Sequence, residues 1–317
     1  MKKFLIVLSM LLTFNYLNVY GETGDAGVTL PVLKYYAGTR AMGLGTAYTS
    51  LADDVTALYW NPAGLRVLNQ QSVYFLFEKL YSGSTYWVSS YAKPVENIGT
   101  FAVGIIQLST GDILGVGSNQ EDLGSYSDSQ TLFILGFGTP FYNIKKFRTH
   151  SLRFLDVGIS AKLLKHSIYN YTSYSFGMDL GVKYIPTKTM GYLRNFIFGL
   201  VIQNFVPPVS TLISTSEWYP LRFKWGITYR ALFDTLFINV DIDTLLFRSQ
   251  YPKFNMGVEY TAMRIFKLRL GYSNGITAGM GMELHDFNFN YAFVYNFDWG
   301  FTHQFSASFK FGNFIHF

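Results

Sequence analysis

From about Gln71 to the C-terminus, apolar and polar side chains alternate along the chain with a period of two. The alternation is plainest in four stretches: FKWGITYR (223–230), FINVDID (237–243), FNMGVEY (254–260) and FNFNYAFVY (287–295). In an extended chain this period places apolar residues on one face and polar residues on the other. The pattern therefore predicts an all-β body.

Segments of this kind predict about fourteen strands, each long enough for the roughly 9–11 residues that a tilted membrane strand needs. They lie near 71–81, 84–93, 97–109, 129–141, 153–166, 171–185, 192–204, 217–230, 234–246, 251–261, 265–273, 276–284, 286–296 and 303–313. The longest irregular stretches, 110–128 and 205–217, are the third and seventh connections and are expected at the extracellular end. The even connections are mostly short, as periplasmic turns are, and 141–151 is an exception.

Two architectures share this pattern. A soluble sandwich or barrel buries its apolar faces inside, whereas a membrane barrel turns them towards lipid and lines a polar lumen. Full charges stand beside glycine on the polar faces, as in Asp179-Leu180-Gly181, and aromatic residues gather near strand ends, as girdle residues do. The sequence therefore favours a transmembrane antiparallel β-barrel over the soluble alternative.

Composition supports export to a membrane. The 317 residues are 49% hydrophobic and 19% aromatic, yet the mean hydropathy is only +0.16, which does not suit a helical membrane protein. Lys2 and Lys3 precede a short apolar run, 4–12, and small residues follow, so residues 1–21 are predicted to be a cleaved signal peptide. The run is too short for the alternative, a membrane anchor. We expect a periplasmic-side hatch at 22–66 and an outer-membrane barrel at 67–317.

Charge and cysteine content exclude several other classes. The chain has 0 Cys, which excludes a disulfide scaffold, a thiolate metal site and a lipidated N-terminal cysteine. The net charge of +5 is spread along the chain without a basic patch, so no nucleic-acid partner is expected. Attraction to anionic lipid headgroups is a better explanation of the excess.

One stretch, 38–65, does not read as alternating strand: GTRAMGLGTAYTSLADDVTALYWNPAGL. Gly43-Leu44-Gly45 hints at a nucleotide-binding loop, but no strand precedes it and the third glycine is missing. The 5 His form no serine–histidine–acid motif, and no metal-ligand spacing occurs. The sequence predicts no enzyme, no catalytic residue, no metal and no cofactor.

The same stretch is long enough to fold into the lumen of a barrel as a hatch. Asp53 is expected to cap a short helix through Ala57, and Asn61 before Pro62 a second turn. Glycine allows close approach to the wall. The expected hatch or gate residues are Gly43, Gly45, Asp53, Asp54, Asn61, Pro62 and Ala63. The polar residues expected to face a wet lumen are Asp179, Lys183, Asp241, Asp243, Glu259, Lys267, Arg269 and Lys310.

Further expectations concern this lumen. Asp53, Asp54 and Asn61 are expected to satisfy helix-end amides or to pair with Lys183, Lys267, Arg269 or Lys310, and Thr228 is expected to face water. A barrel of this size is wider than the roughly eight-stranded barrels that side chains alone can fill, so an empty lumen would conduct water.

The stretch AGTRAMGLGTAYTSLADDVTALYWNPAGL (37–65) closely resembles the N-terminal signature of the PorV/PorQ-type outer-membrane proteins, relatives of the FadL long-chain fatty acid transporters. The resemblance continues through LGSYSDSQ (123–130), LRLGYSNGITAGMGMELHDFNFNYAF (268–293) and THQFSASFKF (302–311). It implies a fourteen-stranded barrel closed by an N-terminal hatch that bears an Asn-Pro-Ala motif, here Asn61, Pro62 and Ala63. The terminal-Phe insertion signal is then Phe317 or Phe311.

The resemblance implies two alternative functions. A FadL-like protein is a passive channel for hydrophobic small molecules such as fatty acids and hydrocarbons, gated by the hatch. A PorV-like protein is instead the component of type IX secretion that receives cargo proteins and hands them over. The expected partners are outer-membrane lipid and lipopolysaccharide, the hydrophobic ligand or the cargo, and the barrel-assembly machinery during insertion.

Overall fold

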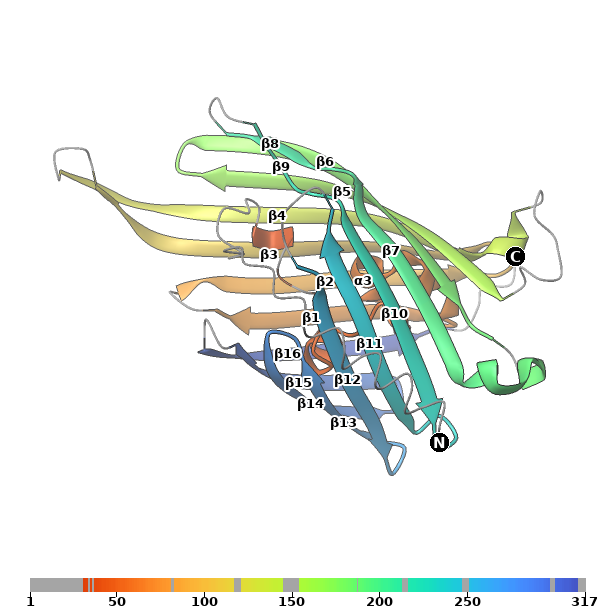
Figure 1. Ribbon diagram of the computed structural model, residues 1–317. Helices are drawn as coiled ribbons and strands as arrows, with labels where there is room; N and C mark the ends of the chain where they lie inside the picture. The colour runs from red at the N-terminus through yellow and green to blue at the C-terminus, as the bar shows by residue number, and fades with distance from the viewer. Residues whose placement is uncertain are drawn as a thin grey trace.

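The structure, a computed structural model, describes residues 31–33, 35, 37–80, 83–116, 121–144, 154–186, 188–212, 216–246, 251–296 and 300–312. The predicted signal peptide, the start of the predicted hatch at 22–30 and Phe317 lie outside the described residues. In the described part of the chain, fourteen strands form a closed antiparallel barrel (Figure 1). The barrel closes where β1 pairs with β16, from Gln71 opposite Phe311 to Glu78 opposite Gln304.

The barrel strands follow one another around the wall in chain order. They are β1 (Gln71–Lys79), β2 (Thr85–Val95), β3 (Gly99–Val116), β4 (Asp122–Pro140), β5 (Leu155–Ile168), β6 (Tyr171–Tyr184), β7 (Phe196–Val206), β10 (Arg222–Ala231), β11 (Leu236–Leu245), β12 (Lys253–Ala262), β13 (Phe266–Tyr272), β14 (Gly275–Leu284), β15 (Phe287–Asn296) and β16 (Gly300–Phe311). β8 (Val209–Thr211) and β9 (Ser216–Trp218) form a separate two-stranded sheet.

The predicted fold class and strand number are confirmed, but the two connections that were expected to be irregular contain strand. Most of 110–128 is strand: β3 and β4 continue past the barrel and pair with each other to Val116 opposite Asp122, through two register shifts. The glycine, serine and aspartate of this stretch suggested a loop, but mutual pairing satisfies the backbone of both segments. This ribbon is visible as the long projection of β3 and β4 in Figure 1. Likewise, 205–217 contains β8 and most of β9.

Strands β7 and β10 begin later than expected, at Phe196 and Arg222. The 3₁₀ segment η8 (Lys188–Asn195) occupies the start of the seventh predicted strand. Another 3₁₀ turn, η5 (Phe141–Asn143), follows β4 in the connection that was expected to be long.

The two faces of the wall have opposite chemistry. Large apolar side chains point outward and are exposed, including Phe75, Phe101, Phe176, Leu270 and Phe305. Alternate residues on the same strands point inward and are buried. An apolar outer face over a closed barrel is the arrangement of a transmembrane barrel.

Four short helical elements precede β1: η2 (Pro31–Leu33), α2 (Thr39–Gly43), α3 (Ala57–Trp60) and η3 (Pro62–Val67). They lie inside the barrel in Figure 1. No helix in the described ranges is both long and apolar enough to cross a membrane.

The outward face gives a direct test. Val240→Arg is expected to lower the free energy of unfolding by about 2–4 kcal/mol, because it carries a charge into lipid near the middle of β11. Leu236→Arg, on the same face at the end of the strand, is expected to cost about 0–1 kcal/mol. Urea unfolding of the barrel in liposomes measures both, and equal costs would contradict this placement of β11.

Candidate functional site

The candidate site is the contact between the barrel wall and the N-terminal segment, which we define as the described residues of 31–68. Most of this segment is buried, and Leu44, Tyr48 and Trp60 are fully so. The tryptophan indole Nε1 donates to the Ala37 carbonyl, and the Tyr59 hydroxyl donates to the Leu33 carbonyl at 3.1 Å. These bonds fold the segment back on itself.

Inward glycines bring the segment against the wall. A Cβ placed on Gly158 would lie 2.2 Å from the Pro62 carbonyl carbon, and one on Gly271 would lie 2.1 Å from the Gly45 nitrogen. Similar overlaps, at 2.2 to 2.5 Å, arise at Gly181 with Asn61, at Gly199 with Thr49 and at Gly257 with Leu44. Strands from β5 to β13 thus leave room for backbone where a side chain would not fit.

The predicted close approach of Gly43 and Gly45 is present. A Cβ on Gly43 would lie 3.1 Å from the Gly279 Cα, and one on Gly45 would lie 2.3 Å from the Tyr272 nitrogen. Gly45 also has a φ of 59°, which glycine adopts without strain.

Asn61 joins the segment to the wall. Its Oδ1 accepts from the Ala63 amide at 3.2 Å, which is the predicted cap of the turn that Pro62 begins. Its Nδ2 donates to the Thr49 carbonyl at 2.9 Å and to the Val182 carbonyl of β6 at 3.2 Å. One side chain therefore holds two parts of the segment to one strand.

The predicted cap at Asp53 is wrong. Asp54 makes the local turn instead, because its Oδ1 accepts from the Thr56 amide at 2.9 Å. The Asp53 carboxylate turns to Arg40 at 2.5 Å. An ion pair with a cation thirteen residues away has replaced a local hydrogen bond, and sequence spacing does not reveal this choice.

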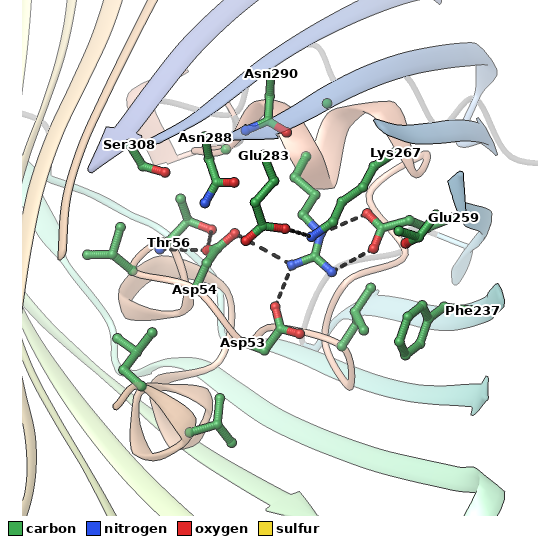
Figure 2. Close-up of a pocket in the computed structure, with 18 of the residues that line it drawn as sticks. Asp53, Asp54, Thr56, Phe237, Glu259, Lys267, Glu283, Asn288, Asn290 and Ser308 are labelled. Carbon is green, nitrogen blue, oxygen red and sulfur yellow. Dashed lines mark hydrogen bonds and ion pairs between the residues drawn. The ribbon is translucent and has the colours of Figure 1, made fainter. Parts of the chain in front are cut away.

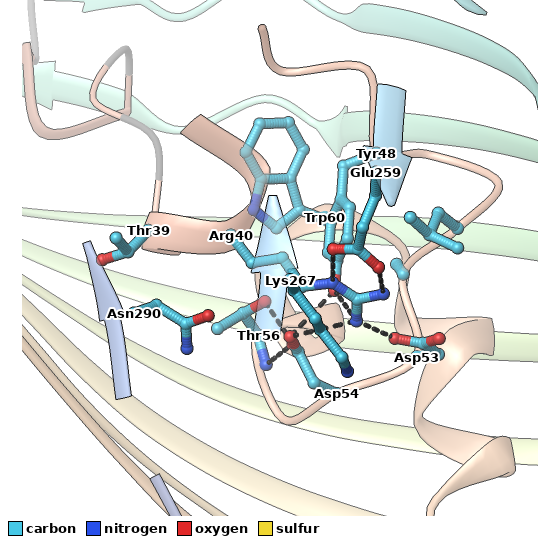
Figure 3. A network of polar contacts seen from close by, with 12 residues as sticks. Thr39, Arg40, Tyr48, Asp53, Asp54, Thr56, Trp60, Glu259, Lys267 and Asn290 are labelled. Carbon is cyan, nitrogen blue, oxygen red and sulfur yellow. Dashed lines mark hydrogen bonds and ion pairs between the residues drawn. The ribbon is translucent and has the colours of Figure 1, made fainter. Parts of the chain in front are cut away.

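Arg40 is the centre of a charged network that Figure 3 shows. Its Nε and Nη2 donate to the two oxygens of Glu259 on β12 at 2.8 and 2.7 Å. Arg269 on β13 donates to the same carboxylate at 2.6 Å. Two oxygens held by two guanidinium groups form a rigid, charge-assisted junction between segment and wall.

Tyr48 closes this network from the other side. Its hydroxyl donates to Asp54 at 2.8 Å, and Arg40 lies 5.5 Å from the centre of its ring. Burial raises the pKa of the Tyr48 hydroxyl well above its usual range, against the opposing effect of Arg40. The tyrosine therefore acts as a neutral donor.

Two predicted lumen carboxylates bind different partners. Asp241 accepts from the Tyr48 and Thr49 amides at 2.9 and 2.8 Å, so it holds the segment backbone. Asp243 pairs with Arg222 of β10 at 2.5 Å, within the wall. Of these two acids on one face of β11, Asp241 therefore binds the segment and Asp243 stabilises the wall.

The remaining predicted cations do not pair with Asp53, Asp54 or Asn61 as expected. Lys183 donates to the Ala52 carbonyl at 2.6 Å and the Leu51 carbonyl at 3.2 Å. Lys267 and Lys310 both bind Glu283, at 2.9 and 3.3 Å. Asp179, another predicted lumen residue, pairs with Lys162 at 2.6 Å. The lysines were assigned to the wrong partners because sequence does not fix which neighbours they reach.

The expectation of a wet environment around Thr228 is also wrong. Thr228 is 0% exposed. Its hydroxyl lies 2.7 Å from the Ser50 hydroxyl and donates to the Asn239 side-chain oxygen at 2.7 Å. The segment fills this part of the barrel, so an arginine at this position would be overpacked.

A cavity of about 750 Å³ lies between the segment and the wall and reaches the short turns at Phe233 and Arg264; Figure 2 shows part of its lining. Its lining is rich in charged and amide side chains from both the segment and the wall. They include Arg40, Asp53, Asp54, Glu259, Lys267, Glu283, Asn288, Asn290 and Lys310. Apolar side chains such as Leu51, Ile197 and Phe237 also line it, so this space has a mixed lining.

The inner wall of β1 to β4 is different, and sequence analysis missed it. Its inward side chains are mainly apolar, and the first described residues of the segment, Val32 and Leu33, belong to the same buried cluster. The wall residues of this cluster include Tyr74, Leu76, Tyr86, Val88, Ile106, Leu108, Leu132, Ile134 and Leu164. The signal was available in β4, where Leu132 and Ile134 alternate with apolar Phe133 and Leu135, so both faces are apolar.

Arg40 was also missed, although it stands within the singled-out stretch. Nothing local distinguishes it from a solvated arginine, and its partner Glu259 is 219 residues away. Within the described ranges no group of three or more histidine, cysteine, aspartate or glutamate side chains is arranged to hold a metal ion.

Comparison with known proteins shows the fold. No family model matches the chain, and no curated protein matches its sequence. Among solved structures, it is similar to a deletion mutant of the TodX monoaromatic hydrocarbon channel, with a TM-score of 0.61 and 13% identity over 90% of this chain and 100% of that one. It is also similar to the CymD monoaromatic hydrocarbon channel, with a TM-score of 0.59 and 12% identity over 87% of this chain and 100% of that one.

A FadL homologue from Pseudomonas aeruginosa gives a TM-score of 0.56 and 10% identity over 87% of this chain and 98% of that one. At these identities the likeness establishes a shared barrel architecture. The resemblance to FadL proteins is thus matched in fold, and the narrower resemblance to PorV/PorQ proteins stays a prediction.

The glycine contacts predict that added side chains will loosen the segment. Gly158→Val and Gly271→Val are each expected to weaken its docking by about 1–3 kcal/mol, the usual cost of overpacking. Hydrogen exchange of amides 39–66 should then accelerate. Gly111→Val is the control, because nothing lies within 4 Å of a Cβ at that position. Unchanged protection in both test variants would contradict the close contact.

The charged network predicts a second effect. Arg40→Met is expected to cost about 3–5 kcal/mol in docking of the segment, because it removes one partner from a buried ion pair. Limited proteolysis and hydrogen exchange of 39–66 would report the loss. Lys79→Met, at an exposed position on β1, should change neither. Protection equal to the parent in Arg40→Met would show that the network does not hold the segment.

Proposed function

We propose that the protein is a passive outer-membrane channel for hydrophobic small molecules, and that the N-terminal segment is the hatch that closes it. The observation that carries the proposal is the apolar inner wall of β1 to β4, which the start of the segment contacts. A polar pore has no need of such a wall, whereas a hydrophobic solute gains free energy from every part of it that it contacts.

The two sides of the lumen suggest how the hatch works. Arg40, Asn61 and the amides of Tyr48 and Thr49 bind the wall between β6 and β13 through charges and hydrogen bonds. The described residues of 31–37 meet β1 to β4 mainly through apolar and aromatic contacts, such as Tyr35 with Tyr86 at 5.6 Å, and the Val32 amide also donates to Gln130 at 3.1 Å. A solute that displaces this part from the apolar wall has to break its hydrogen bonds with Tyr59 and Trp60, but it leaves the anchors of 39–66 to β6 to β13 intact.

Gly38 lies between the two parts. Its φ of 119° is accessible to glycine and costly for other residues, and a Cβ there would lie 3.2 Å from the Thr56 hydroxyl. We assign it as the hinge of the hatch.

The structural neighbours support the class of solute. TodX and CymD are described as monoaromatic hydrocarbon channels, and the third is a homologue of FadL. Location in the outer membrane, with lipid, lipopolysaccharide and the barrel-assembly machinery as partners, belongs to the same proposal, because closed barrels with an apolar belt are of the outer-membrane type.

Deletion of residues 31–66 tests both parts of the proposal. The barrel is expected to fold, since its strand ladder closes without the segment, and to give large conductances in planar bilayers because the lumen is wider than side chains can fill. Gated uptake of a monoaromatic hydrocarbon into proteoliposomes should be replaced by unselective leakage of small polar solutes.

The matched control shortens the β3–β4 ribbon by deleting 112–126, which lies beyond the barrel, and should keep the parent conductance. A hatch deletion that inserts normally but conducts no more than the parent would contradict closure by the segment. Loss of surface cargo proteins with unchanged hydrocarbon uptake would instead favour the secretion role.

A further inference from the structure

Three neighbouring turns at the short-turn end of the barrel carry large apolar side chains into solvent. Phe233, between β10 and β11, is 104% exposed; Tyr192 in η8 is 95% exposed and Met263, between β12 and β13, is 85% exposed. The strands that these turns join are adjacent in the wall. Figure 1 shows η8 and the ends of β10 and β11 at the same end of the barrel. The exposed side chains therefore belong to one arc of the rim.

The backbone does not account for these side chains. Leu232, Phe233 and Asp234 have φ values of 50°, 58° and 65°, and Met263 and Arg264 have 52° and 60°. Tight hairpin turns with positive φ favour Asn, Asp and Gly, and bulky residues are uncommon there. The chain tolerates local strain to present these particular residues at the tips.

Cations accompany the apolar tips. Arg194 and Arg264 are exposed, and neither forms an ion pair with another described residue. Arg230 fixes the arc, since its Nη2 donates to the Arg194 carbonyl and so ties η8 to β10. Apolar side chains beside unpaired arginines match a surface of anionic headgroups over acyl chains.

The arc continues the lipid-facing surface of the same strands. Phe196 of β7 and Tyr229 of β10 stand on the outer face with ring centres 5.1 Å apart, and exposed Phe266 begins β13 next to the Met263 turn. Turns elsewhere in the described part of this rim have polar tips, Glu96-Asn97 and His285-Asp286, although Ile98 beside the first is 51% exposed. Among the described turns, the large apolar side chains that are 85% exposed or more, Tyr192, Phe233 and Met263, all lie on this arc.

We propose that Tyr192, Leu193, Phe233 and Met263, with Arg194 and Arg264, form a rim surface that inserts into the anionic phospholipid headgroups of the periplasmic leaflet. The rim surface anchors one side of the barrel more deeply than the other. The inference rests on the membrane placement proposed above and is independent of what the channel carries.

Single cysteines provide the test, because the chain has 0 Cys of its own. Nitroxide labels at Phe233→Cys, Asn97→Cys and Val240→Cys would be compared in nanodiscs of phosphatidylglycerol and of phosphatidylcholine. Collisions with oxygen relative to a water-soluble nickel complex report depth. Position 240 is the lipid control, and position 97 is the aqueous control on the polar side of the rim.

In phosphatidylglycerol, the oxygen-to-nickel ratio at 233 is expected to lie near that at 240 and well above that at 97. It should fall in phosphatidylcholine, and Arg194→Gln with Arg264→Gln should abolish the difference between the two lipids. A label at 233 that is as accessible to nickel as the label at 97 in both lipids would overturn the proposal and point to an aqueous protein partner. A lipid-like ratio at 240 in the same samples shows that such a failure does not come from wrong membrane placement.

Discussion

Backbone-to-backbone contact between the N-terminal segment and the inward glycines is the constraint on which the interior depends. At Gly158 and Gly271 a single added carbon would overlap the segment's main chain. Contact this close fixes the segment to within a fraction of an ångström, which is the precision that the hydrogen bonds of Asn61 and Asp241 require. The charged network can form because the wall lacks side chains at these positions.

The interior combines two kinds of packing that are usually separated. Around Arg40, buried charges are satisfied by several partners each, so that the desolvation of Glu259 is offset by two guanidinium groups. Against β1 to β4, contacts are mainly apolar and non-directional, with few hydrogen bonds such as that from the Val32 amide to Gln130. Directional bonds break over a short displacement, whereas apolar contacts can be exchanged for those of a solute. The short N-terminal segment therefore has one part that is held rigidly by directional bonds and another part whose apolar contacts a solute can replace.

Sequence alone predicted the barrel, because the alternation of apolar and polar residues that marks each strand is a local property of the chain. It also singled out 38–65 and the Asn61 cap, since a cap lies within two residues of its partner. It could not predict the pairing of Arg40 with Glu259, because this depends on how the segment lies against β12. Nor could it predict the pairing of Lys267 with Glu283, because this depends on the register of β13 against β14. The apolar inner wall was missed for a different reason. In a strand with two apolar faces the apolar and polar residues do not alternate, so the sequence does not show that the inward face is apolar.

The ribbon of β3 and β4 has a consequence of its own. Barrel neighbours accompany β3 only as far as Ser109, opposite Thr85, and β4 only from Asp128, opposite Ile168. Beyond these residues the two strands pair only with each other, and the register shifts interrupt even that ladder. Each of these strands therefore has an inner part that is paired on both edges and an outer part that is paired on one edge only, and the two parts differ in local stability. The outer parts of β3 and β4 can therefore separate from each other while the barrel stays closed. The register shift between Thr110 and Ile113 marks the boundary between the part that can open and the part that unfolds only with the barrel.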